Sequence, residues 1–460
     1  MTEHTSYEID IDTIENKLSI DKDKLILNKL NNVIVLPFKT SSIKCDLNDI
    51  SSIESYVFRE VLGIEKSEIK ELEYFLDEVI SKVDSEYKTK LKDVIKSMYT
   101  SSGELTKFHP KMYIYGGKES SGVKNIAKYI IETFVDQIFV DSINSVIFSS
   151  PNSILEEIVL NTIPLNIIRK NSKTISGQPL LPYIKDLFSK DLEILCTQEK
   201  LFTQNIDKLI KYYLFFYTSQ IILSLRHGFA EVEKLDKVFY FVEWEKISRS
   251  RNGYRQGWRM IEKKSENIFA YVNLIQILNT TKDGKSVGSF QDIKSVLLNM
   301  ELNAQLLFKD DVKRLDKNIR KVLGLGEKSV PKKKIFEGFD EIDHLLQTLI
   351  DAKDKGTGNR KSAYDKYERN IKDVANLGFI KARGQMGLTT IINQSWLIFF
   401  TRLAIGSRKK IRLNQLWKEF EIRGISFDKY TRQEIVTYFE KINVLEKKSD
   451  SGDAQYVRVL

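Results

Sequence analysis

The sequence predicts a mostly α-helical fold with a minor α+β component, in the form of small strand elements. Apolar side chains recur every three or four residues over long stretches of the 460-residue chain, as they do along the buried face of a helix. Seven prolines are too few to interrupt many of these stretches, and 42% hydrophobic with 29% charged residues is ordinary for folded domains. A chain of this length is expected to form roughly two to four domains.

Residues 1–115 are predicted to form an acidic N-terminal α/β region. Strands are expected at 32–36, before Pro37, and at Met112–Tyr115, with helices within 51–100. The first 100 residues carry 14 Lys and Arg against 20 Asp and Glu, whereas the other 360 carry 58 against 43. This difference favours a protein partner for the acidic end and nucleic acid for the basic remainder. Solvated helix faces of a lysine-rich chain are the alternative explanation of the charge.

Residues 116–325 are predicted to form a helical body. Its helices are expected at about 121–139, 152–169, 183–196, 204–225, 259–279 and 290–308. Lys237–Trp244 is the best strand candidate of the chain, because it is rich in β-branched and aromatic residues. Residues 326–385 are expected to be a linker and helical region, since glycines lie among dense charges at 324–334 and 353–361.

Residues 386–460 are predicted to form a winged helix-turn-helix domain. Apolar periodicity indicates three successive helices within 390–442, the third capped by Ser426 or Asp428. A hairpin that turns at 449–453 follows them. Three helices and a hairpin in this order match the winged variant of the helix-turn-helix.

Catalysis and metal binding find little support in the sequence. Two cysteines and four histidines are scattered without the spacing of metal ligands or of a nucleophile with its base. The loop 117–124 has the glycine spacing of a phosphate-binding loop, but Val123 stands where the lysine is required. Acid-x-Lys tripeptides such as Glu262–Lys264 lack a partner acid on a core strand, which argues against a magnesium-dependent nuclease. We therefore expect a protein that is not an enzyme, with no catalytic residue, no metal and no cofactor.

The chain is expected to be cytoplasmic and to make no contact with membranes. It opens on acidic residues rather than on the basic and then apolar segments of a signal peptide. The uncharged stretches 142–155 and 212–225 are too short to span ~30 Å of hydrocarbon. A longer one, 384–401, contains several polar side chains and is predicted to be a buried helix.

The basic and aromatic segment 244–264 is the main candidate site. Of the 18 arginines in the chain only three precede position 249, whereas four lie within the next eleven residues. Trp244, Tyr254 and Trp258 are interleaved with them. Arginines beside aromatic platforms are typical of a nucleic-acid groove, although tryptophans buried in the core would produce the same pattern. Contacts with DNA phosphates are expected from Arg249, Arg251, Arg255 and Arg259.

The C-terminal domain contains a second set of candidates. Between 384 and 418 there is no acid, and the approach to the second helix carries a group of cations that includes Arg408, Lys409, Lys410 and Arg412. On the third helix, Gln433 and Thr437 are placed to reach base edges and Arg432 to hold a phosphate. Glu440 and the acidic wing tip oppose this, so backbone contact or protein docking is favoured over sequence-specific readout.

The chain resembles the DptG family, which are subunits of DNA phosphorothioation-dependent restriction systems. The resemblance is carried by Tyr240–Lys246, Gly257–Trp258 and Ser449–Arg458. It implies a bacterial anti-phage defence role on DNA, in a complex with DptF-like and DptH-like protein subunits that perform the ATP-driven work. It implies no catalytic residue for this chain. Two alternatives stay open: a winged-helix transcriptional regulator that binds a short operator, and an unrecognised magnesium-dependent nuclease that cleaves DNA alone.

Overall fold

A computed structural model describes most of the chain: residues 7–66, 72–83, 86–101, 104–115, 117–163, 179–230, 235–326, 336–355, 359–447 and 455–458. The protein is mostly helical with small sheets, as the sequence predicts. Among the described residues, no helix combines the length with the apolarity that crossing a membrane requires.

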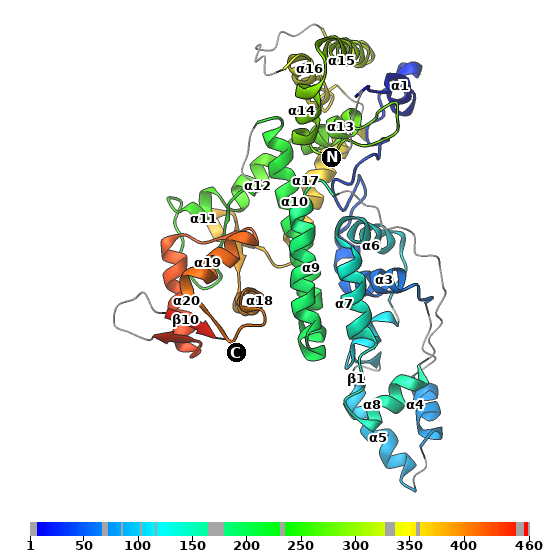
Figure 1. Ribbon diagram of the computed structural model, residues 1–460, viewed down its shortest axis with the longest axis vertical. Coiled ribbons are helices and arrows are strands. Elements are labelled where there is room, and N and C mark those ends of the chain that lie inside the picture. The colour runs from blue at the N-terminus through cyan, green and yellow to red at the C-terminus, as the bar shows by residue number, and fades with distance from the viewer. Residues whose placement is uncertain are drawn as a thin grey trace.

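Two long helices, α9 (Pro182–Cys196) and α10 (Glu199–His227), pack along the middle of the molecule (Figure 1). The 29 residues of α10 are apolar on nearly all sides in its second half, as expected for a helix that is buried all round. It contacts the N-terminal helix α3 (Ile50–Leu62), the upper helix α13 (Ile268–Leu278) and α17 (Asn359–Ala375). The helix α10 is therefore the common core element of the fold.

The N-terminal part is more helical than predicted. Its helices are α1 (Ile11–Leu18), α2 (Lys44–Leu47), α3, α4 (Leu72–Ser81), α5 (Lys88–Tyr99), α6 (Ser121–Phe134), α7 (Gln137–Ile147) and α8 (Ile154–Thr162). The strand expected at 112–115 is a 3-10 helix, Pro110–Ile114, whose apolar side chains are all buried rather than alternating. In 32–36 only one isolated bridge forms, between Ile34 and Pro179. The helices α4, α5 and α8 lie together at one end of the molecule (Figure 1).

At the opposite end, α13 packs against α16 (Phe339–Asp351) and α17, α16 packs against α15 (Leu302–Leu323), and α14 (Phe290–Asn299) completes the group of four neighbouring helices (Figure 1). Residues 7–32 are attached there, because the Tyr7 hydroxyl donates to the carbonyl of Leu278 and the backbone N–H of Asn32 donates to Oε1 of Gln276. Residues 7–32 therefore pack on an element that lies about halfway along the sequence.

The C-terminal part alternates short strands with three helices. Its elements are β5 (Ile380–Ala382), β6 (Leu388–Ile392), α18 (Gln394–Ile405), β7 (Lys410–Arg412), α19 (Leu413–Ile422), β8 (Ile425–Ser426), α20 (Lys429–Lys441), β9 (Leu445–Lys447) and β10 (Gln455–Arg458). An antiparallel sheet has the order β7-β10-β9, with Val457 opposite both Ile411 and Leu445. Asp428 caps α20 as predicted, since its carboxylate accepts from the backbone N–H of Tyr430 and Thr431.

The strand candidate 237–244 belongs to this C-terminal part. β3 (Val238–Phe239) pairs in parallel with β8, and β4 (Phe241–Val242) pairs in parallel with β6 in a sheet of order β4-β6-β5. A buried ion pair adds a second link, because Arg423 at the end of α19 donates to Asp191 of α9 at 2.5 and 2.9 Å. The helical body and the C-terminal elements therefore share both a sheet and a buried charge pair.

Candidate nucleic-acid interface

The basic and aromatic segment folds into a turn and two short helices after β4. These are α11 (Asn252–Arg255) and α12 (Trp258–Ser265). Trp258 and Ile261 are buried, so one face of α12 is fixed against the protein. The Trp258 indole N–H donates to Glu262, whereas Trp244 is 38% exposed and packs its ring on Tyr438. Trp258 is therefore a core residue rather than a stacking platform.

Two glycines hold α11 and α12 against the sheet. The position of Gly257 in a loop suggests that glycine is needed for an unusual turn. Its φ is negative, however, so a positive φ is not the reason for glycine here. A Cβ at Gly257 would lie 2.3 Å from Oγ1 of Thr390 and 2.8 Å from the carbonyl oxygen of Phe239. A Cβ at Gly253 would lie 2.8 Å from the Phe241 ring. Close approach of the backbone to β3, β4 and β6 is the reason for glycine at both positions.

Arg251 does not lie on the surface of this segment. Its side chain is only 9% exposed, and its guanidinium forms ion pairs with Glu245 at 2.9 Å and Asp428 at 2.6 Å. It also donates to the Thr431 hydroxyl and stands over the ring of Phe241. Because all of its donor groups point into the protein, we leave Arg251 out of the candidate interface.

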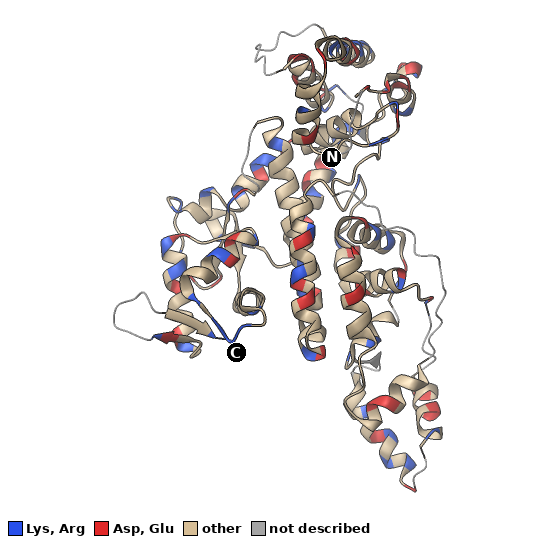
Figure 2. Ribbon diagram, viewed as in Figure 1, with Lys and Arg blue, Asp and Glu red and all other residues tan. Residues whose placement is uncertain are grey.

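The other three arginines of the segment lie around one shallow basic cavity. It has a volume of about 420 Å³ and is lined by Arg249, Tyr254, Arg255, Arg259, Met260, Lys263 and Lys264. The Arg259 guanidinium donates to the Tyr254 hydroxyl at 2.7 Å, and that of Arg249 donates to the carbonyl of Gln385 at 3.1 Å. All lining residues are cationic, aromatic or apolar, so the cavity has five positive charges and no carboxylate on its wall. Lys and Arg positions, blue on the ribbon, recur along this part of the chain in Figure 2.

The structure adds two lysines to the predicted set of arginines at this cavity. Lys263 follows Arg259 by four residues, so both lie on the same face of α12, the face opposite Ile261. This i, i+4 spacing in an amphipathic helix is the sequence signal by which Lys263 joins the cavity. Glu262, the acid of the same helix, accepts from the Trp258 indole N–H and does not line the cavity.

The predicted residues of α20 form a smaller surface. Gln433 and Thr437 are exposed, and the Thr437 hydroxyl donates to the carbonyl of Gln433. Arg432 forms an ion pair with Glu421 at 2.8 Å and stands over the Trp417 ring. With Lys429 and Gln433 it lines a hollow of about 390 Å³. Gln433 and Thr437 are therefore accessible, whereas Arg432 is already paired with a carboxylate.

The cations around β7 are mostly engaged with the protein. Arg408 donates to the carbonyls of Ile405 and Ala404 at the end of α18 and lies 3.5 Å from Glu419. Lys410 pairs with Glu446 at 2.6 Å, and Arg412 donates to the Tyr456 hydroxyl. Lys409 is exposed. This group is not among the residues that line the basic cavity of α11 and α12.

The loop 117–124 has a carboxylate where a phosphate would bind. Ser120 caps α6 and donates to Asp46, and a Cβ at Gly122 would lie 2.0 Å from an Asp46 carboxylate oxygen. Lys124 is already paired with a carboxylate, that of Glu119 at 3.0 Å. This arrangement favours a structural junction at the start of α6. Elsewhere in the described chain, His, Cys, Asp and Glu side chains form no group of three that could hold a metal ion.

No protein-family model matches this chain, and no curated protein matches it in sequence.

Proposed function

We propose that this protein is a non-catalytic, DNA-binding subunit of a bacterial phosphorothioation-dependent restriction complex, assembled with ATPase- or helicase-type partner subunits. The observation that supports DNA binding most is the basic cavity of α11 and α12, where five cations line one surface without a carboxylate. The restriction complex and its DptF-like and DptH-like partners are proposed on the sequence resemblance alone.

The basic cavity suits the sugar–phosphate backbone rather than base edges. Arg255 is exposed beside Arg259, and a planar guanidinium binds two phosphate oxygens at once. Each neutralised phosphate releases condensed counterions, so affinity would fall with a slope of about −0.9 per phosphate in log salt. Such binding is nearly independent of sequence, as a subunit that acts on long tracts of DNA requires.

We infer that residues 386–460 form a winged helix-turn-helix domain. Its support is the order α18, β7, α19, β8, α20, β9 and β10, in which β7, β9 and β10 form one antiparallel sheet while β8 pairs with β3. In this arrangement α20 would be the recognition helix and the β9–β10 hairpin the wing. Gln433 and Thr437 are its exposed base-reading candidates, whereas a phosphate contact by Arg432 would require the loss of its pairing with Glu421. Its contribution would be secondary to that of the basic cavity.

Partner docking is proposed for the end of the molecule formed by α4, α5 and α8. These helices carry exposed apolar side chains: Val94 and Met98 on one face of α5 are 45% and 58% exposed, and Ile154 at the start of α8 is 78% exposed. The acids of α4 are partly neutralised, because Glu73 and Asp77 pair with Lys92. An apolar surface, rather than the net acidic charge, is therefore the better candidate for contact with another subunit.

Replacement of both Arg255 and Arg259 by Ala in the full chain tests DNA binding. Affinity for two 25-bp duplexes of unrelated sequence, measured by fluorescence anisotropy, should fall to the same extent for both. The salt slope should become shallower by about 1 for each lost phosphate contact. The matched control is Arg314→Ala, since Arg314 is an exposed arginine on α15 paired with Asp12 and lies outside the cavity. A double variant that binds both duplexes like the wild type would overturn the proposal.

Two further measurements on the purified protein separate the other functional classes. A transcriptional regulator would lose affinity for one operator on Gln433→Ala and keep its affinity for unrelated duplexes. A nuclease would cleave DNA when Mg²⁺ is added to the purified protein. Either result would replace the proposed function.

A further inference from the structure

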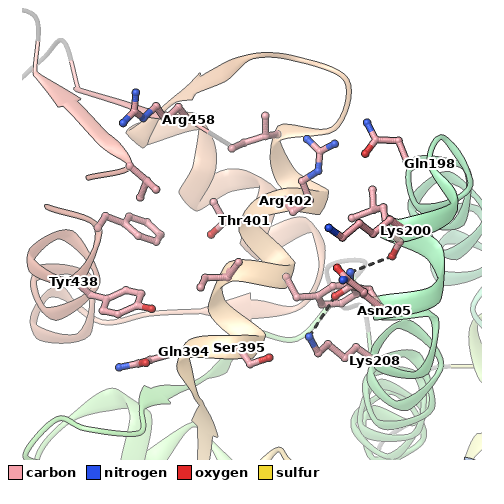
Figure 3. Close-up of a pocket in the computed structure, with 17 residues that line it drawn as sticks. Gln198, Lys200, Asn205, Lys208, Gln394, Ser395, Thr401, Arg402, Tyr438 and Arg458 are labelled. Atoms are coloured by element: carbon pink, nitrogen blue, oxygen red, sulfur yellow. Dashed lines mark hydrogen bonds between the residues drawn. The ribbon is translucent and has the colours of Figure 1, made fainter. Parts of the chain in front are cut away.

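A second and larger cleft lies between the first half of α10 and the helix α18. Its volume is about 860 Å³, and α20, Val444 and β10 form its remaining wall. In Figure 3 the side chains of Lys200 and Lys208 extend from α10 toward α18, whereas Tyr438 of α20 lies on the other side of α18; all three line the cleft. None of the elements that line it contributes to the basic cavity of α11 and α12.

Four cations line this cleft without a carboxylate partner in the described part of the chain. They are Lys200, Lys208, Arg402 and Arg458, and the lining includes no acidic residue. Their neutral acceptors are the Asn205 amide oxygen for Lys208, the Gly406 carbonyl for Arg402 and the Asn443 carbonyl for Arg458. Burial lowers the pKa of Lys208, which indicates a cation partly removed from water. An anion placed here would therefore satisfy charges that the protein itself does not.

Neighbouring cations outside the cleft differ in this respect. Lys211, less than one turn further along α10, pairs with Asp207, and Lys410 pairs with Glu446. Arg423 pairs with Asp191 and Glu419. These three cations are neutralised by carboxylates, whereas the four cations of the cleft have none among the described residues.

Between the cations the cleft has apolar and amide surfaces. Leu201, Ile398 and Phe399 belong to its apolar part, and Lys208 Nζ lies 6.0 Å from the centre of the Phe399 ring. Tyr438 is partly exposed, with Trp244 packed against its ring. Exposed amides at Gln204 and Gln394 can exchange hydrogen bonds with either donors or acceptors. Cations, an aromatic face and amides together match the phosphate, the base plane and the base edges of a nucleotide.

We propose that this cleft binds single-stranded DNA, one or two nucleotides at a time, with the phosphates at Lys208 and Arg402 and a base against Tyr438. A volume of this size holds a ligand of small-molecule dimensions, so an unpaired strand can enter whereas a duplex can only touch the rim. An acidic peptide would satisfy the cations but would leave the aromatic face and the amides without a role. The proposal adds a single-strand site to the duplex-backbone surface proposed above and does not depend on it.

The test measures the full chain against labelled dT10 and a 25-bp duplex in parallel. The double variant Lys208→Gln, Arg402→Gln should bind dT10 at least about ten-fold more weakly and with a shallower salt slope, by about 0.7 per lost phosphate contact. Tyr438→Leu should weaken dT10 binding by about five-fold or more. Gln204→Glu adds a negative charge at an exposed lining position, so it should act in the same direction without disturbing the core.

Duplex affinity should stay unchanged in these variants and fall instead in the Arg255, Arg259 variant, so the two sites are distinguishable. The matched control is Lys190→Gln, an exposed lysine of α9 outside the cleft, which should bind dT10 like the wild type. Unchanged dT10 affinity in the double variant and in Gln204→Glu would overturn the proposal. Competition by polyglutamate as strong as that by unlabelled dT10 would also overturn it, in favour of an acidic peptide.

Discussion

Arg251 and Asp428, 177 positions apart, form a bidentate ion pair in which Nε lies 3.0 Å from Oδ2 and Nη2 lies 2.6 Å from Oδ1. Asp428 is at the same time the N-cap of α20. Glu245 extends the network, since it pairs with Arg251 and accepts from the Thr431 hydroxyl. Burial raises the pKa of Glu245, opposed by Thr431 and Arg251. The turn that leads to the basic cavity is therefore fixed to the start of α20 by buried charges.

The replacement Arg251→Ala should destabilise the protein by about 3–5 kcal/mol, because it leaves two nearly buried carboxylates without their cation. Arg251→Lys should recover little of this, since an ammonium group cannot make the bidentate contact. Urea denaturation, with the slope checked for constancy, measures both changes.

Arg249→Ala is the matched control for this loss of stability. The Arg249 side chain is exposed and makes one hydrogen bond to the Gln385 carbonyl, so its removal should change the free energy of unfolding by about 0.5 kcal/mol or less. Equal stabilities for the two alanine variants would show that the Arg251 network is not a stabilising element.

Charge introduced into the apolar face of α5 should prevent assembly with partner subunits. Val94→Glu and Met98→Glu place a carboxylate at an exposed position, so folding is preserved while an apolar interface would have to bury an unpaired charge. Co-purification with DptF-like and DptH-like subunits is expected to be lost, and binding of the 25-bp duplex is expected to remain.

Asp93→Lys serves as the charge-changing control on the same helix, because Asp93 is exposed and lies about 100° from Val94 and about 140° from Met98 around the helix. It should leave co-purification intact. Retention of the partner subunits by the Met98→Glu variant would move the docking surface to another part of the chain.

Local periodicity was sufficient for most of the helices, including α9 and α10, and for the cap at Asp428. It failed at Met112–Tyr115, where burial on all sides replaces the alternation of a strand. It also failed at Thr390, which is expected to begin the first C-terminal helix but belongs to β6. The strand forms there because β4, 150 positions earlier in the chain, pairs with β6 in parallel. Pairings across such distances leave no trace in a local pattern.

The candidate site shows the same limit. Arg251 and Arg255 are the same residue type in the same basic and aromatic segment. The Arg251 side chain is nearly buried, whereas Arg255 is exposed. What separates them is Asp428, which no spacing rule connects with residue 251. The cleft between α10 and α18 is lined by residues near position 200 and near position 400. Its lining therefore could not be predicted from any local sequence pattern.

A buried carboxylate in α3 gives the protein a predictable pH dependence. Glu54 is 1% exposed, and its Oε2 lies 3.1 Å from Lys107 Nζ, which in turn stands over the Tyr113 ring. Oε1 of Glu54 has no hydrogen-bond partner among the described residues. Burial raises the pKa of Glu54 to about 7, against the opposing effect of Lys107.

Because the pKa of Glu54 is higher in the folded state than in the unfolded chain, the folded protein binds the proton more tightly between about pH 4.5 and 7. Stability should therefore decrease as the pH rises through this interval and should then level off. Glu54→Gln cannot ionise, so its stability relative to the wild type should increase with pH, by up to about 3 kcal/mol between pH 5 and 8. Urea denaturation at several pH values measures the difference. Glu60→Gln, at an exposed position of the same helix, should follow the wild-type profile; parallel profiles for Glu54→Gln and the wild type would exclude a raised pKa at Glu54.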